Sequence, residues 1–147
     1  MEQTKYYKVE AEVPGDFTRK STIDRTKIPF KVLDLVYTFD RWLGDDIATS
    51  LGEFIVTERL RQRLVEFAGT GYIFDKVRVT KSDKFKFSAS NRPDAFPPLS
   101  KFHWLKITGI AGQDDFGLGE NWDLIVSEPA LSVLKSCQFV LGTAEEI

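Results

Sequence analysis

The order of apolar and polar residues along the chain predicts several strands and two amphipathic helices. Residues 6–13 alternate, with Tyr7, Val9, Ala11 and Val13 on one face, as a half-buried strand requires. Runs rich in β-branched and aromatic residues predict further strands at 31–39, 72–80, 101–110 and 138–142. The polar segments 15–29 and 111–121 are punctuated by Gly or Pro and are expected to form surface connections, and 143–147 is expected to fray.

One phrase occurs twice, seventy residues apart. EFIVTERLRQRL at 53–64 and DLIVSEPALSVL at 123–134 both begin as an apolar strand and then change to the spacing of an amphipathic helix. Thr57 and Ser127 stand where each helix would begin, and a hydroxyl there can cap a free backbone N–H. A glutamate follows each cap, where its charge suits the positive end of the helix dipole. Each copy therefore encodes a strand that runs directly into a capped helix.

The similarity extends upstream of the quoted phrase. Asp45–Ile47 precedes the first copy as Asp114–Phe116 precedes the second, with one extra residue in the second gap. A duplicated structural unit would explain this match. The physics of any strand-to-helix junction, which favours hydroxyl caps and glutamate, would explain part of it as well. If the unit is duplicated, each helix can bury its apolar stripe against the other copy.

Composition points to one soluble domain. The 147 residues are long enough to form a core without staples, and 42% are hydrophobic and 13% aromatic. The net charge of −2 and the scattered basic residues are unlike those of a nucleic-acid binder. The single cysteine, the lack of a signal-like N-terminus and the lack of a long apolar run predict a cytoplasmic protein with no membrane segment.

We predict an α+β fold, with a mixed or mainly antiparallel sheet of about seven or eight strands and two helices packed on it. The repeated strand-helix-strand unit supplies both helices, which begin after Thr57 and Ser127. We expect a single domain over 1–147, divisible into halves at about 1–88 and 101–147 by a segment rich in Pro and Ser.

No pattern in the chain predicts catalysis. His103 has no carboxylate or cysteine at ligand spacing and is interpreted as structural, and Cys137 falls on the apolar stripe of the second helix. Nucleophile-elbow, phosphate-loop and dinucleotide motifs are absent from the sequence. Scattered carboxylates such as Glu58 and Glu128 are already explained by helix capping. We therefore predict a protein that is not an enzyme and uses neither a cofactor nor a metal.

The acidic loops before each copy contain the candidate binding residues. Neither loop has the ligand order of a calcium-binding EF-hand, and aspartates there can instead cap turns. Next to aromatic side chains, they also suit the steering and anchoring of a basic partner, although the tryptophans can equally belong to the core. The predicted partner-binding residues are Trp42, Asp45, Asp46, Asp114, Asp115, Phe116 and Trp122.

Residues 40–142 resemble a family of bacterial immunity proteins from polymorphic toxin systems, the family numbered eleven, which includes double-CXXCG paralogues. The resemblance rests on ITGIAGQDDFGLGENWDLIVSEPALSVLKSCQF and DDIATSLGEFIVTERLRQRL, in which a VSE junction follows a tryptophan-containing strand and an Asp-Asp-Phe loop. This chain has only Cys137, so it departs from the CXXCG pattern and from any metal site made by it. Pro129 also stands where the first copy has an arginine.

The resemblance implies a cytoplasmic protein that binds and neutralises a cognate toxin by protein–protein interaction, without catalysis. The alternative is a module that binds or senses a small molecule in an aromatic-lined pocket between the halves. A deep apolar cavity would favour that alternative, whereas a neighbouring gene for a large multidomain toxin would favour immunity.

Overall fold

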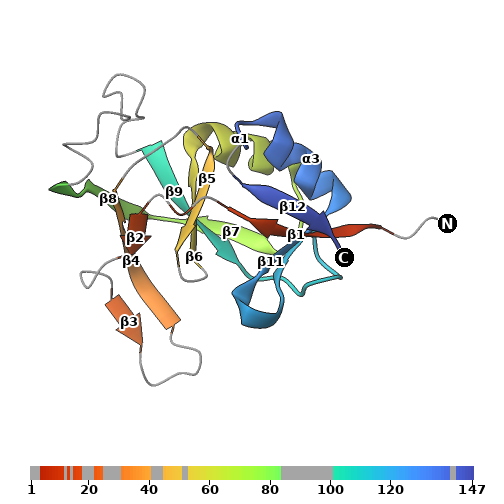
Figure 1. Cartoon of the computed structure of the whole chain (residues 1–147), viewed down its shortest axis with the longest axis horizontal. Coiled ribbons are helices and arrows are strands. Elements are labelled where there is room, and N and C mark those ends of the chain that lie inside the picture. Colours follow the sequence, from red (N-terminus) through yellow and green to blue (C-terminus); the bar gives the residue numbers. More distant parts are fainter. Residues whose placement is uncertain are drawn as a thin grey trace.

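A computed structural model of the chain (Figure 1) contains two helices and three small sheets among the residues it describes, which are 4–11, 13, 15–17, 22–24, 31–40, 45–50, 53–83, 101–139 and 142–147. The helices are α1 (Glu58–Phe67) and α3 (Glu128–Ser136). The predicted α+β class with two helices is confirmed. The strands divide among three sheets, whereas one larger sheet was expected.

Two of the sheets are antiparallel and have the same plan. In the first sheet the order is β5 (Ile47–Ser50), β6 (Glu53–Thr57), β9 (Phe102–Ile107) and β7 (Tyr72–Asp75). In the second sheet the order is β10 (Phe116–Leu118), β11 (Leu124–Ser127), β1 (Tyr6–Glu10) and β12 (Thr143–Glu146). In each sheet the second strand runs directly into a helix, α1 or α3.

The strand register shows that the two sheets are copies of one unit. Val56 pairs with Ile47 on one side and with His103 on the other. At the matching position of the second sheet, Val126 pairs with Phe116 and Tyr7. We call β5, β6, α1, β7 and β9 the first unit, and β10, β11, α3, β12 and β1 the second unit. The N-terminal strand β1 thus belongs to the second unit, with the C-terminal strands. The two units therefore differ from the predicted halves at 1–88 and 101–147.

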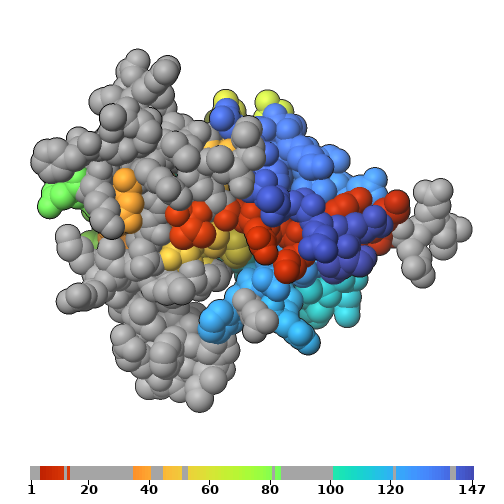
Figure 2. All heavy atoms as spheres, in the orientation of Figure 1, coloured from red at the N-terminus to blue at the C-terminus, as the bar shows by residue number. Residues whose placement is uncertain are grey.

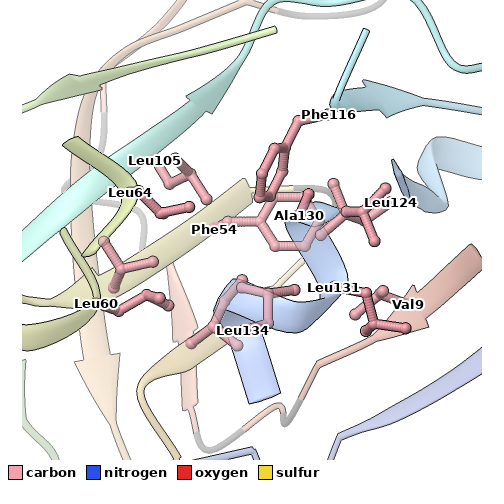
Figure 3. Close-up of a cluster of buried hydrophobic side chains, with 13 residues drawn as sticks. Val9, Phe54, Leu60, Leu64, Leu105, Phe116, Leu124, Ala130, Leu131 and Leu134 are labelled. Carbon is pink, nitrogen blue, oxygen red and sulfur yellow. The ribbon is translucent and has the colours of Figure 1, made fainter. Parts of the chain in front are cut away.

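The two units bury their apolar faces against each other. Figure 1 shows α1 and α3 side by side, and the helices contact one another. The shared core lies beneath them (Figure 3), and nearly every member has a counterpart in the other unit. The matched pairs are Ile47 and Phe116, Phe54 and Leu124, Val56 and Val126, Leu60 and Ala130, Leu64 and Leu134, and Leu105 and Val9. Each helix therefore covers its apolar stripe with the partner unit, as duplication required.

The third sheet covers the outer face of the first unit. It contains β2 (Gly15–Phe17), β4 (Lys31–Phe39) and β3 (Thr22–Asp24), and β8 (Val77–Lys81) pairs with β4 in parallel. Side chains from both layers form a second apolar cluster: Leu35, Tyr37, Phe39, Ala48, Ile55, Val79, Phe102 and Trp104. The first unit is consequently buried on both faces.

Several local predictions need correction. The strand predicted at 6–13 ends at Glu10, and the connection predicted at 15–29 contains β2 and β3. The strand predicted at 72–80 is interrupted at Lys76, so that its halves join different sheets as β7 and β8. The connection predicted at 111–121 contains β10.

The last strand was placed a few residues too early. Gln138, Phe139 and Gly142 are outside any strand, and β12 instead takes up residues that were expected to fray. Those residues form a strand because they pair with residues Tyr7 to Glu10 of β1. The segment rich in Pro and Ser that was expected to divide the halves lies outside the described residues.

Candidate functional site

Asp46 is a buried hub of hydrogen bonds at the start of the first unit. Its side chain is 2% exposed. The Oδ1 atom accepts from the Thr57 hydroxyl at 2.6 Å and from Arg59 Nε at 3.2 Å. The Oδ2 atom accepts from Arg59 Nη2 at 2.7 Å and from the backbone N–H of Gln138 at 2.6 Å. Thr57 in turn accepts from the Leu60 N–H, so its hydroxyl both caps α1 and binds Asp46.

Asp115 occupies the same place in the second unit. Its Oδ1 atom accepts from the Ser127 hydroxyl at 2.6 Å, and Ser127 caps α3 by accepting from the Ala130 N–H. Its Oδ2 atom accepts from the backbone N–H of Thr70 at 3.0 Å. The backbone hydrogen bonds of the two units also correspond. The Thr57 N–H donates to the Asp46 carbonyl, and the Ser127 N–H donates to the Asp115 carbonyl. The acidic residues are thus part of the duplicated unit itself.

The two aspartates also tie the units together reciprocally. Asp46 in the first unit binds Gln138, which follows α3, and Asp115 in the second unit binds Thr70, which follows α1. The start of each helix therefore lies near the end of the other, and the helices run antiparallel. Each carboxylate accepts from a cap hydroxyl and from a backbone N–H that follows the other helix, and hydrogen bonds to a charged acceptor are stronger than those between neutral groups.

This geometry corrects the expected binding surface. Asp45 and Asp46 are both buried, and Phe116 is 0% exposed within the core between the units. Buried side chains at these positions build the fold and present no surface to a partner. Asp115 is half-buried and committed to Ser127 and Thr70, and half-buried Asp114 accepts from the Ile110 N–H at 2.7 Å. Trp42 lies outside the described residues.

Trp122 is the predicted site residue that the structure does place at the surface. It ends η2 (Glu120–Trp122), a short 3-10 turn between β10 and β11, and its side chain is 53% exposed. Its backbone has a φ of 59°. Exposed Glu120 begins this turn, and half-buried Asp123 follows it. Figure 2 shows the light blue segment that contains β10 and the turn on the outer surface of the molecule.

A second polar cluster, which sequence reasoning missed, lies at the start of α1. The Glu58 carboxylate accepts from Arg61 Nη2 at 2.5 Å and Nε at 2.9 Å, and it contacts His103 Nε2. The hydrogen bonds from Arg61, assisted by His103, lower the pKa of Glu58 to about 2 against the opposing effect of burial. In the second unit Tyr7 and Leu131 replace His103 and Arg61, so this cluster belongs to the first unit. The signal was hidden because 45 residues separate Glu58 from His103.

Cys137 is a half-buried free thiol at the end of α3, and burial raises its pKa. Among the described residues, no group of three or more His, Cys, Asp or Glu side chains is arranged to hold a metal ion. Within the same part of the chain, neither helix has the length and apolar character needed to cross a bilayer.

No model of a protein family matches the chain, and no curated protein sequence matches it significantly. The resemblance to immunity proteins therefore stays a prediction from the residues quoted above.

Proposed function

We propose that this protein is an immunity protein that binds a cognate bacterial toxin in the cytoplasm and neutralises it through a protein–protein interface. The proposal starts from the resemblance carried by the repeated junctions and the Asp-Asp-Phe loop. In the structure these motifs form the scaffold of the two units. The interface must then lie on surfaces that the duplicated scaffold presents.

The observation that carries the proposal is the charge of the second unit. From Thr108, the residue after β9, to Leu134 of α3 the sequence holds five acidic residues and no lysine, arginine or histidine. Two of these acids, Glu120 and Glu128, are exposed, and Asp123 is half-buried. Strand β12 of the same unit adds exposed Glu145 and Glu146, against which the helix and strands of the unit carry Lys8 and Lys135. A chain with a net charge of only −2 thus gathers negative charge on one unit.

The first unit lacks this excess of acids, because its helix and strands carry four acidic residues and four lysines or arginines. Helix α1 carries Arg59, Arg61 and Arg63, whereas α3 carries a single Lys135. Separation of charge of this kind orients a charged partner during encounter and raises its association rate. The partner favoured by the second unit is a basic protein surface, as a toxin that acts on a polyanionic target would offer.

The experiment pairs the chain with the C-terminal domain of a multidomain toxin encoded beside its gene. Co-expression should protect cells from that domain, and the two purified proteins should bind with an association rate that falls as salt rises. The double change Glu120→Lys and Asp123→Lys should slow association at least about tenfold at low salt. Glu66→Lys, on exposed α1 in the first unit, is the matched control and should leave the rate unchanged.

Two results would reject the proposal. One is that the chain gives no protection and no binding with the neighbouring toxin domain. The other is that the chain binds the toxin domain but the double variant, the Glu66→Lys control and the wild type associate with it at equal rates. The second unit would then contribute nothing to binding.

A further inference from the structure

The hairpin turns of the two units differ by one residue. In the first unit Ser50 pairs with Glu53, so two residues of the sequence separate the paired positions. In the second unit the Gly119 N–H donates to the Asp123 carbonyl at 2.8 Å, which leaves the three residues of η2. The extra residue in the second gap of the sequence repeat is therefore located in this turn. The rest of the two hairpins keeps the same register.

The last position of the longer turn has an unusual occupant. Three-residue hairpin turns commonly end with a residue in the left-handed region, which glycine adopts without steric cost. Here that residue is Trp122, with a φ of 59°. A bulky side chain is disfavoured in this conformation. Backbone strain of this kind persists where the surrounding structure enforces it, and it is concentrated at functional positions.

Burial of the indole does not offset the backbone strain at Trp122, because about half of the residue faces solvent. A second exposed apolar side chain is on the adjacent segment, since Ile110 is 59% exposed and forms a bridge with Leu118 of β10. Glu120 and Asp123 add negative charge beside the indole. The turn therefore combines a projecting aromatic group with an acidic rim, and tryptophan is enriched among residues that dominate interface energies.

We propose that Trp122 is the anchor of the toxin interface, and that its indole enters an apolar pocket bordered by basic groups on the toxin domain. This inference rests on the proposed function and adds the residue and the contact to it. Trp122 is the last residue of the longer turn, and Ile110, which forms a bridge with Leu118 of β10, supplies a second exposed apolar side chain. The acidic side chains beside the indole select a partner whose pocket is edged by lysine or arginine.

The test compares Trp122→Gly with the wild type in binding to the toxin domain encoded beside the gene. Glycine suits the left-handed backbone, so this variant should fold with a Tm equal to or above that of the wild type. Loss of an anchoring tryptophan should weaken binding about 30-fold or more. Trp122→Phe, which keeps an aromatic ring, should bind with intermediate affinity. Ile73→Ala removes an equally exposed apolar side chain from the first unit and should bind like the wild type.

The outcomes separate this inference from the proposed function. If the wild type binds and Trp122→Gly binds within about threefold of it, the anchor is wrong and the immunity function stands. If the wild type fails to bind the toxin domain, both proposals fail. If Trp122→Gly converts a wild-type dimer into a monomer in analytical ultracentrifugation and leaves toxin binding intact, the turn contacts a second copy of the chain and the inference is overturned.

Discussion

The hydroxyl of Thr57 donates a 2.6 Å hydrogen bond to the carboxylate of Asp46, and the same hydroxyl accepts from the first turn of α1. Ser127 and Asp115 repeat this relationship at the start of α3. Each helix is therefore fixed by a pair of residues, a cap and the acid behind it. Because the acid also binds the segment after the other helix, this pair couples the start of one helix to the end of the other.

Replacement of Asp46 by alanine should destabilise the protein severely. The variant leaves the Gln138 N–H and the Thr57 hydroxyl without their charged acceptor, and each buried donor left without a partner costs about 1–3 kcal/mol. Arg59 also loses its counter-ion, but its side chain is 58% exposed and can be solvated. Urea unfolding measures the loss. Asp75→Ala, which removes an exposed ion pair with Lys106, is the control and should cost about 1 kcal/mol or less. Equal urea midpoints for the two variants would contradict the stabilising role of the Asp46 hydrogen bonds.

The cap and its acid should be energetically coupled. Thr57→Ala removes both hydrogen bonds of the hydroxyl and should cost about 1–2 kcal/mol, whereas Thr57→Ser keeps the hydroxyl and should be close to neutral. In a double-mutant cycle with Asp46→Ala, the interaction energy should be about 0.5–3 kcal/mol. Simple additivity of the two losses would contradict the coupling.

The end of α1 offers a stabilising substitution. Ala68 forms the C-cap with a φ of 52°, a left-handed position that glycine normally takes. Ala68→Gly should therefore raise the free energy of unfolding by up to about 1 kcal/mol. Glu66→Gly, two residues earlier inside the helix, should lower it by about 1 kcal/mol. The two changes add the same residue type, so effects of equal sign would refute the assignment of Ala68 as a left-handed cap.

Acid should weaken the fold through Glu58. Its pKa is lowered from 4.5 to about 2 in the folded protein, chiefly by Arg61, so its stabilising effect is full above pH 4.5 and is lost as the pH falls towards 2. Glu58→Gln removes the titrating group. The difference in unfolding free energy between wild type and Glu58→Gln should hence shrink between pH 5 and 2. A difference that stayed constant over that range would disprove the lowered pKa.

The sequence predicted what is encoded locally. The caps at Thr57 and Ser127, the glutamates after them and the apolar stripes of both helices lie within a few residues of one another, and all are present in the structure. The class of the fold followed from those elements. Pro129 lies in the first turn of α3, where a missing backbone N–H costs no hydrogen bond, so it agrees with these local signals.

What the sequence could not predict depends on distant partners. Asp46 looked like a surface residue because acids are rarely buried, and the donor that accompanies its burial, Gln138, is 92 residues away. Residues 72–80 divide at Lys76 because the two parts have different partners. The first part, β7, pairs with β9, and the second part, β8, pairs with β4. The place of β1 in the second unit likewise needs the register with β11, which no local pattern encodes.

The pairing of β1 with β11 and β12 gives the most direct test of the two-unit architecture. Strands β1 and β12 are antiparallel neighbours, and the Ile147 N–H donates to the Tyr6 carbonyl, so the ends of the described chain meet. A permuted protein with a short Gly-rich linker between residues 147 and 1 and new termini at residues 12–14 should fold, because β12 and β1 become a hairpin and each unit becomes continuous. It should also fold faster than the wild type, since the contacts of β1 become local.

Stopped-flow refolding measures the rate, with native-like circular dichroism as the control. A permuted protein that cannot fold, or that folds more slowly, would show that β1 is not the missing strand of the second unit.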